Sequence, residues 1–245
     1  MAVDASKVAG AQALLAKFRP WFDKYRGGMT AGLMAAIMQH ESGGKFVAGD
    51  ASLGEVGYFQ VASYVPPLFG YPAEARNDPE SNVAIASLEY ALEAVKWYLR
   101  YPQYVRLGTR DSWELARLAF AIGRAGSYSL AAAADKLGYL QPGQVYAGIQ
   151  KYIAANGAPA LGSQSSSKVA ARVASIPDQF DLAEYIDGGF TAGYGKPTII
   201  PAPPAGPYKI PADVAPYFVE PLPGIVLLAL GAGSALLYYL WKRSR

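Results

Sequence analysis

The feature that most constrains the fold of the first 156 residues is a series of apolar residues at helical spacing. Glycine and proline interrupt this series at short intervals. Residues 5–25 follow the 3.6-residue period of an amphipathic helix, with Pro20 as an expected kink. Glycine or proline ends each further helix that this pattern predicts, at 30–42, 79–101, 112–122, 129–137 and 143–156. Residues 45–77 are rich in Gly, Pro and aromatic residues and predict irregular structure. The fold class indicated is mainly α.

Composition excludes several kinds of site. The chain of 245 residues has no cysteine, so disulfides, thiolate catalysis and cysteine-ligated metals are excluded. His40 is the only histidine, which excludes a multi-histidine metal centre and any Ser-His triad that lacks it. The net charge is only +3, with no run of Lys and Arg before the last four residues. We therefore expect no metal, no other cofactor and no nucleic-acid partner.

An uncharged run near the C-terminus predicts a membrane anchor. Gly224–Trp241 contains 18 residues, which would span about 27 Å as a helix, close to the thickness of a bilayer core. Aromatic and then basic residues follow at one end, as in a single-pass helix whose basic end stays inside: Tyr238, Tyr239, Trp241, Lys242, Arg243 and Arg245. The bulk of the chain would then lie outside that membrane, and Gly224–Trp241 would be its contact with the lipid bilayer.

Composition also predicts three parts along the chain. Residues 1–156 would form the α-rich domain. Residues 157–221 are rich in Pro, Gly, Ser and Tyr and predict a long linker or stalk. Residues 222–245 would be the transmembrane helix with its basic end. The first ten residues include Asp4 and Lys7 and do not resemble a secretion signal.

Glu41 is the acid that the helical pattern singles out. It follows Ile37 by four residues and Met38 by three, so its carboxyl projects from the apolar face near the end of a helix. Desolvation and the negative end of the helix dipole both favour the protonated form of such an acid. A carboxylic acid that keeps its proton can protonate a glycosidic oxygen. Asp50 and Glu55, in the loop that follows, are second-choice acids.

Four motifs around this acid together resemble the soluble lytic transglycosylase family, which has a lysozyme-like fold. Glu41 and Ser42 match a Glu-Ser pair that ends a helix in the family. Gly57–Gln60 matches a Gly-Leu-Met-Gln-like tetrapeptide at its Gly and its Gln. Asp78–Val83 resembles the Asp-Pro start of the next helix, and Ala119–Gly123 lies where the family has Ala-Tyr-Asn-x-Gly. The resemblance covers roughly residues 28–155.

The resemblance implies a lysozyme-like catalytic domain that cleaves the β-1,4 MurNAc–GlcNAc bond of peptidoglycan glycan strands. Glu41 would protonate the glycosidic oxygen and then, as a carboxylate, take the proton of the C6 hydroxyl, which gives a 1,6-anhydro product. The substrate contacts that the resemblance implies are Ser42, Gly57, Gln60, Phe120 and Tyr146, with Tyr152 as the alternative to Tyr146.

Two departures from the family keep alternatives open. Phe120 lacks the hydroxyl, and Ala121 the amide, that the family's Ala-Tyr-Asn-x-Gly motif normally supplies. A hydrolysing lysozyme or chitinase-like enzyme, and a catalytically inactive glycan-binding virion protein, are the alternatives. A transglycosylase domain with a C-terminal anchor fits a bacteriophage protein of an internal virion membrane that opens the cell wall during genome delivery and associates with other virion membrane proteins. A bacterial inner-membrane enzyme with its catalytic domain outside is the other setting.

Overall fold

The computed structural model describes residues 4–162, 164–188 and 193–219, and these are mainly helical, as expected. The helices are α1 (Ala5–Tyr25), α2 (Ala31–Ser42), α3 (Pro79–Arg100), α4 (Arg110–Ile122), α5 (Arg124–Lys136), α6 (Val145–Asn156) and α7 (Ser166–Ile186), with short 3₁₀ helices η1 (Pro66–Phe69), η2 (Ala73–Asn77) and η3 (Ala215–Tyr217). β-structure within these ranges is limited to isolated bridges. None of the helices described is long and apolar enough to cross a membrane. The expected anchor, Gly224–Trp241, lies outside the described residues.

Local capping signals set the helix boundaries. The Thr30 hydroxyl accepts the Leu33 N–H at 3.0 Å at the start of α2, and Gly43, with φ of 61°, ends that helix. Helix α4 begins at Arg110, slightly earlier than the Ser112 cap expected from the sequence, because Thr109 is the N-cap. Thr109 and Ser112 bond each other's backbone N–H groups in a capping box.

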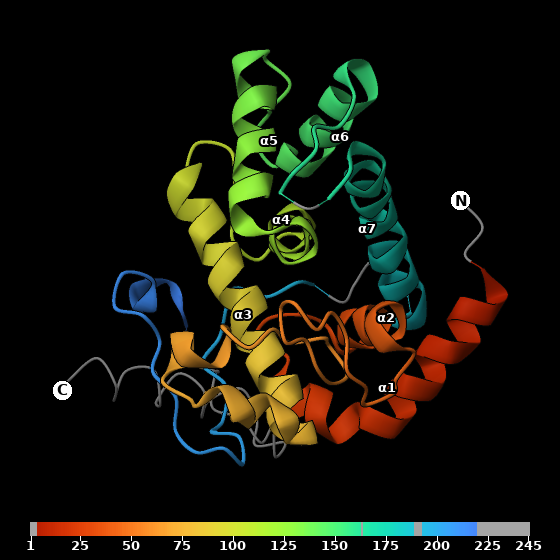
Figure 1. The fold of residues 1–245 in the computed structure, drawn as a ribbon, viewed down its shortest axis with the longest axis vertical. Coiled ribbons are helices and arrows are strands. Elements are labelled where there is room, and N and C mark those ends of the chain that lie inside the picture. The colour runs from red at the N-terminus through yellow and green to blue at the C-terminus, as the bar shows by residue number, and fades with distance from the viewer. Residues whose placement is uncertain (1–3, 163, 189–192, 220–245) are drawn as a thin grey trace, which may run out of the picture.

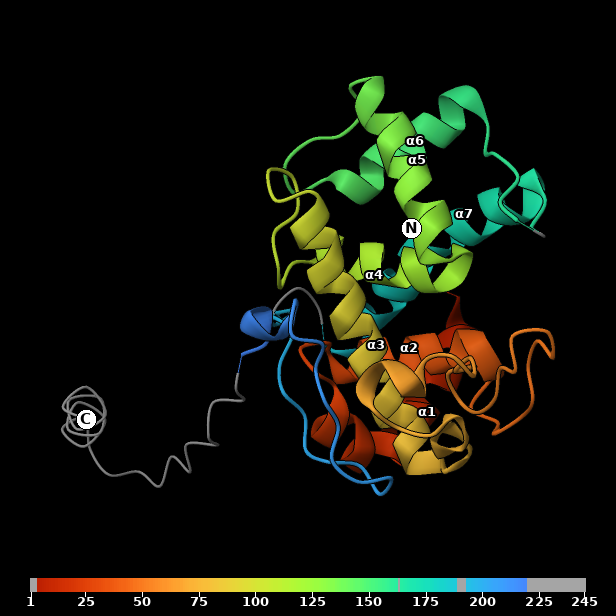
Figure 2. The same ribbon diagram turned by 60° about the vertical axis from the view of Figure 1, so that its left-hand side comes forward.

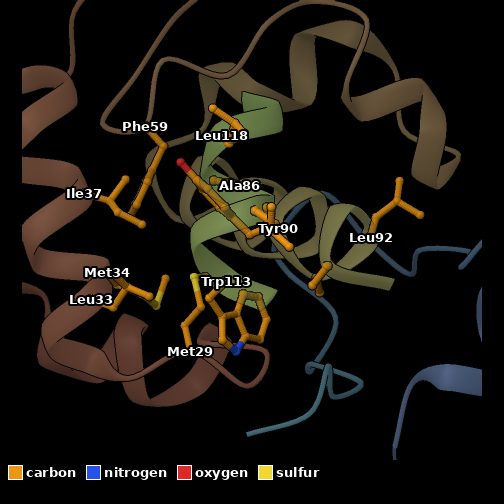
Figure 3. Packing of buried hydrophobic residues seen from close by; sticks show 14 of the residues in the cluster. Met29, Leu33, Met34, Ile37, Phe59, Ala86, Tyr90, Leu92, Trp113 and Leu118 are labelled. Carbon is orange, nitrogen blue, oxygen red and sulfur yellow. The ribbon is translucent and has the colours of Figure 1, made fainter. Parts of the chain in front are cut away.

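Helix α3 runs through the middle of the molecule (Figure 1). Helices α1 and α2 and the irregular residues 43–77 lie beside its N-terminal half. Helices α5 and α6 lie toward its other end, with α4 between the two groups, and Figure 2 shows the same division. The core joins the groups: Leu33, Met34 and Ile37 of α2 face Tyr90 of α3 and Trp113 of α4 (Figure 3).

Helix α7 is the main difference from the sequence-based division, because residues 166–186 were expected to be part of a stalk. Its buried apolar residues recur at helical spacing and pack against α2 and α4: Val169, Val173, Ile176, Phe180 and Ala183. Pro177 lies inside the helix. The carboxyl of Asp187, just after α7, accepts the Gly32 N–H at 3.1 Å in the first turn of α2. Residues 166–186 therefore belong to the folded domain.

Residues 193–219 also pack on this domain. Ile200, Val214 and Phe218 are buried. The Lys209 N–H donates to the Phe69 carbonyl at 3.0 Å, and the Ala205 N–H donates to the Ser81 hydroxyl at 3.1 Å. The described residues of the expected linker are thus attached along much of their length to the helices that precede them.

Candidate active site around Glu41

Glu41 lies in the last turn of α2, where this helix meets α4. The buried residues Ala31–Met38 fix α2 in the core, and the Glu41 side chain is 16% exposed. Arg117 of α4, whose side chain is only 3% exposed, donates from Nη2 to Glu41 Oε1 in an ion pair. The sequence predicts that this acid projects from the apolar face of its helix and keeps its proton. The structure instead places a buried cation against it, because Arg117 reaches it from a helix far away in the chain.

The Arg117 guanidinium is held from several sides. Its Nε donates to Gln179 Oε1 of α7 at 2.9 Å, and its Cζ lies 5.4 Å from the centre of the Phe120 ring. Burial lowers the pKa of Arg117, but the neighbouring Glu41 and Tyr90 raise it more, and the net shift is upward. Arg117 is therefore a fixed cation that orients one oxygen of Glu41.

Tyr90 of α3 forms another wall of this region. Its ring stacks on Phe120, with centroids 5.0 Å apart and planes 14° from parallel. Its hydroxyl, buried and without a hydrogen-bond partner among the described residues, points toward the space between Phe59 and Leu118 (Figure 3). Burial raises the pKa of this phenol far above its ordinary value, and the charge of Glu41 adds to the rise. Tyr90 thus stays neutral beside the ion pair.

Ser42, expected as a substrate contact, ties the end of α2 to the tetrapeptide. Its hydroxyl donates to the Tyr58 carbonyl at 2.8 Å and accepts the Gly44 N–H at 3.2 Å. The Tyr58 ring in turn packs edge-on against Phe18 of α1 at 4.8 Å between centroids. Two of the motifs named in the sequence are therefore joined directly, and the hydroxyl of Ser42 is used in joining them.

Gly57 and Gln60 also make contacts within the protein. Gln60 has a φ of 53° and is buried, and its amide donates to the Gly57 carbonyl at 2.6 Å and the Val47 carbonyl at 3.3 Å. Asn82, at the start of α3, donates to the Val56 carbonyl at 3.0 Å and accepts the Phe59 N–H at 3.3 Å. These bonds fold residues 47–61 onto the start of α3. A substrate contact at Gly57 or Gln60 stays a prediction.

Gly57→Ala is expected to lower the free energy of unfolding by about 2–4 kcal/mol. The φ of Gly57 is 92°, and an added Cβ would lie 2.3 Å from the Asn82 amide nitrogen, so both backbone strain and a clash oppose the substitution. Urea denaturation followed by circular dichroism measures the change. Gly138→Ala is the matched control, since Gly138 has a φ of 74° with open space around it. Equal losses in both variants would show that the Asn82 contact contributes nothing.

The structure separates the other two expected contacts. Phe120 is partly exposed beside Arg117, and the carbonyl of Ala121 accepts a hydrogen bond from Arg172 of α7. Tyr146 is buried in α6, its hydroxyl donates to the Val173 carbonyl, and its N–H donates to Asp111 Oδ1 at 2.8 Å. Phe120 thus lies at the Glu41 site, whereas the hydroxyl of Tyr146 joins α6 to α7.

Glu55 is the second-choice acid whose charge interacts with that of Glu41. Burial raises the pKa of Glu55, the bond from the Asp50 N–H opposes the rise, and the charge of Glu41 adds to it. Asp50 is exposed, and its carboxylate accepts hydrogen bonds from Ser52 at 2.9 and 2.6 Å within a turn. Of the two loop acids, Glu55 is therefore the one whose pKa responds to the charge of Glu41.

Sequence reasoning missed Arg117, Tyr90 and Gln179 as parts of this site. Tyr90 is a core residue of α3, but its ring also stacks on Phe120 beside the ion pair. A signal for Arg117 does exist, since it is a cation among the apolar residues Leu115, Leu118 and Ile122 of a helix. A cation at such a position indicates a buried anionic partner. The pattern does not say which acid that partner is.

A hollow of about 1110 Å³ lies elsewhere, at the opposite end of α2. Thr30, Ala31, Asp187 and Lys196 are among the residues that line it. Glu41 lies ten residues after Ala31, about 15 Å along the helix axis. This hollow is therefore separate from the site around the ion pair. Within the described ranges, no group of His, Asp and Glu side chains is arranged to hold a metal ion.

Comparison with protein-family models, with curated proteins and with solved structures finds no match to this chain. Its function is therefore inferred from the motifs in the sequence and the geometry around Glu41.

Proposed function

We propose that this protein is a lytic transglycosylase that cleaves peptidoglycan glycan strands, with Glu41 as its catalytic acid/base. The observation that carries the proposal is the setting of Glu41. It is a partly exposed carboxyl at the meeting point of α2 and α4, held on one oxygen by the buried Arg117. The motif residues Ser42 and Gly57–Gln60 fold against the end of the same helix. A carboxyl oriented in this way satisfies the positional requirement of general acid–base catalysis.

The two oxygens of Glu41 would have different tasks. Oε1 is bound by Arg117, while Oε2 accepts no hydrogen bond from the described residues and is the oxygen that exchanges a proton with substrate. The reaction starts from the form of Glu41 that has taken up a proton on Oε2 from solvent, and in the first step this Oε2–H protonates the glycosidic oxygen. The C1–O bond breaks with its electron pair on the leaving oxygen, and the N-acetyl oxygen of the same sugar stabilises C1. Arg117 stabilises the carboxylate that this step leaves.

In the second step the Glu41 carboxylate takes the proton of the C6 hydroxyl while that oxygen bonds to C1. The product is a 1,6-anhydro sugar, no water is consumed, and Glu41 is again protonated. One carboxyl suffices for this route. Phe120, which is partly exposed, would provide the aromatic side of the site against which a sugar ring packs, with the buried ring of Tyr90 stacked behind it.

The presence of a second acid, Glu55, favours a second candidate function, that of a hydrolase with the same fold. Its charge interacts with that of Glu41. An inverting glycosidase places its two carboxyls roughly 6.5–9.5 Å apart with a water between them. In that mechanism Glu55 would be the base that activates the water. An inactive glycan-binding protein, suggested by Phe120 and Ala121, is the third reading.

Mass spectrometry of purified peptidoglycan sacculi digested by the protein tests the proposal. Muropeptides that end in 1,6-anhydro-muramic acid are the expected products. Muropeptides with reducing ends would instead indicate that the protein is a hydrolase. Binding to sacculi without cleavage would indicate that it is a glycan-binding protein. Intact sacculi without bound protein would contradict all three.

The setting proposed for this activity is a membrane surface, with the anchor at Gly224–Trp241 beyond the described residues. An internal virion membrane with associated virion proteins is our first choice, and a bacterial inner membrane with the catalytic domain outside is the alternative. Detection of the protein in purified virus particles supports the first.

A further inference from the structure

Arg172 of α7 is a cation at the Glu41 site that the steps above do not use. Its Nη1 donates a hydrogen bond to the carbonyl of Ala121 in the last turn of α4. Ala121 directly follows Phe120 in the chain. The centre of the Phe120 ring lies 5.4 Å from Cζ of Arg117, which binds Glu41. These contacts place the Arg172 guanidinium next to the aromatic side of the proposed site.

Arg172 has donors that the described part of the chain does not use. A guanidinium carries five N–H groups, and within the described residues only Nη1 of Arg172 donates a hydrogen bond. The arginines of α4 and α5 differ, because Arg110, Arg117 and Arg124 each pair with a carboxylate of the protein. Arg172 pairs with no acid in these ranges and is partly exposed. Its charge is therefore available to an anion from outside the protein.

Arg172 is also accessible to a glycan bound at this site. The side chains of Glu41, Phe120 and Arg172 are all partly exposed, so each can contact a molecule that binds at the surface. A sugar ring that packs on Phe120 within reach of Glu41 would present its substituents to the neighbouring Arg172. The bond from Arg172 to the Ala121 carbonyl uses one N–H group and holds the guanidinium in this position.

The basic face of α7 also lies within electrostatic range of the loop that follows α2. Lys168 precedes Arg172 by four residues, so both lie on one face of α7, and Lys168 is exposed. Burial raises the pKa of Glu55, and the charge of Arg172 opposes the rise. Hydrogen bonds from Ser52 lower the pKa of Asp50, and the charge of Lys168 adds to this effect. The loop with its acids and the basic face of α7 are therefore neighbours.

We propose that Arg172 is a specificity-determining residue, which binds a carboxylate carried by MurNAc and so selects peptidoglycan over neutral glycans. The inference rests on the proposed function and extends it. A guanidinium binds a carboxylate through two parallel N–H bonds, a geometry that few other side chains offer. Each MurNAc carries a lactyl carboxyl group, which is either a free carboxylate or is joined to a stem peptide with carboxylates of its own. Polymers of N-acetylglucosamine alone carry none.

Cleavage of matched glycan strands with and without carboxylates tests this role. Soluble strands are prepared both with their stem peptides and with the stem peptides removed. Half of each preparation is coupled to ammonia with a carbodiimide, which converts the carboxylates into neutral amides. The wild type is expected to have a KM about tenfold higher on amidated strands, with kcat within about threefold, because a charge-assisted hydrogen bond is lost. A difference confined to strands with stem peptides would assign the bond to a peptide carboxylate, and one that persists without them would assign it to the lactyl group.

Variants of Arg172 connect this discrimination to the guanidinium. Arg172→Gln is expected to have the raised KM on both kinds of strand and so to lose the preference for carboxylates. Arg172→Lys keeps the charge without the two parallel donors, and should keep a preference of about threefold. Lys151→Gln is the matched control, since it removes an exposed cation of α6 with the same change in net charge, and should keep the full preference.

Two results would overturn the role of Arg172. One is a wild type that does not distinguish carboxylate from amidated strands, a comparison that needs no variant to fold. The other is an Arg172→Gln variant that changes cleavage of both kinds of strand by the same factor, as expected if Arg172 only caps the end of α4. Either result leaves the proposed function intact if the wild type still cleaves. If it binds strands without cleaving them, the Kd values of the same strands take the place of KM. If it neither cleaves nor binds, both proposals fail.

Discussion

Arg117→Met is expected to lower the free energy of unfolding by about 3–5 kcal/mol. The substitution leaves Glu41 with an unpaired charge in a site where its side chain is only 16% exposed. It also removes the 2.9 Å bond from Arg117 to Gln179. Methionine keeps much of the volume of the arginine stem, so the loss reports mainly on the charge. Urea denaturation of the wild type and the variant measures it.

A double-mutant cycle separates the ion pair from the packing of Arg117. Glu41→Gln combined with Arg117→Met leaves neither charge unpaired, so the pair of changes is expected to cost less than the sum of the two single changes. Arg19→Met is the matched control, because Arg19 pairs with Asp23 at the surface, with side chains 56% and 47% exposed, and its loss should cost less than about 1 kcal/mol. An Arg117→Met variant as stable as this control would contradict a buried ion pair.

Glu41→Gln is expected to lower the rate of glycan cleavage by about 10²–10⁴-fold, the usual contribution of a general acid or base. The amide has the size of the carboxyl, and its carbonyl oxygen can still accept the Arg117 N–H. It cannot donate and recover a proton as the reaction requires. The release of soluble fragments from sacculi gives the rate, and circular dichroism establishes that the variant is folded.

Two neighbouring acids serve as controls for Glu41. Asp50→Asn changes an exposed loop acid and should leave the rate near the wild-type value. Glu55→Gln should also leave a transglycosylase active, whereas it would disable a hydrolase that uses Glu55 as its base. A Glu41→Gln variant with more than about a tenth of the wild-type rate would remove Glu41 from the catalytic role.

Much of the helical fold can be predicted from local signals. The Asp78 carboxyl accepts the Ser81 N–H at 2.7 Å, as the Asp-Pro pattern suggested, and Gly43 ends α2 in the left-handed region. These signals act within a few residues, so they can be recognised from the sequence alone. Helix α7 was missed because the Ser- and Ala-rich residues around its apolar stripe, together with Pro177, resemble a linker composition. Its stability comes from packing against α2 and α4, which a local pattern does not contain.

The site was only partly predictable, for the same reason. Glu41 was singled out by its place at the end of an apolar helix, and the motifs placed Ser42 and the tetrapeptide Gly57–Gln60 with it, which the bond from Ser42 to the Tyr58 carbonyl joins. Its bond to Arg117 joins residues 76 positions apart, and Gln179 supports that bond from α7. Pairing at such distances depends on how α2, α4 and α7 cross, which helical periodicity does not determine.

Helix α7 reaches both ends of the helix that carries Glu41. Asp187 bonds the first turn of α2, and Gln179 bonds the cation that holds its last turn. A fragment ending at residue 156, where the composition changes, would therefore lose both supports and expose the apolar face on which α7 lies. The shortest segment of the chain that keeps these contacts to α2 therefore extends through Asp187. Any gene fusion or domain exchange that kept Glu41 in this setting would have to cut the chain beyond that point.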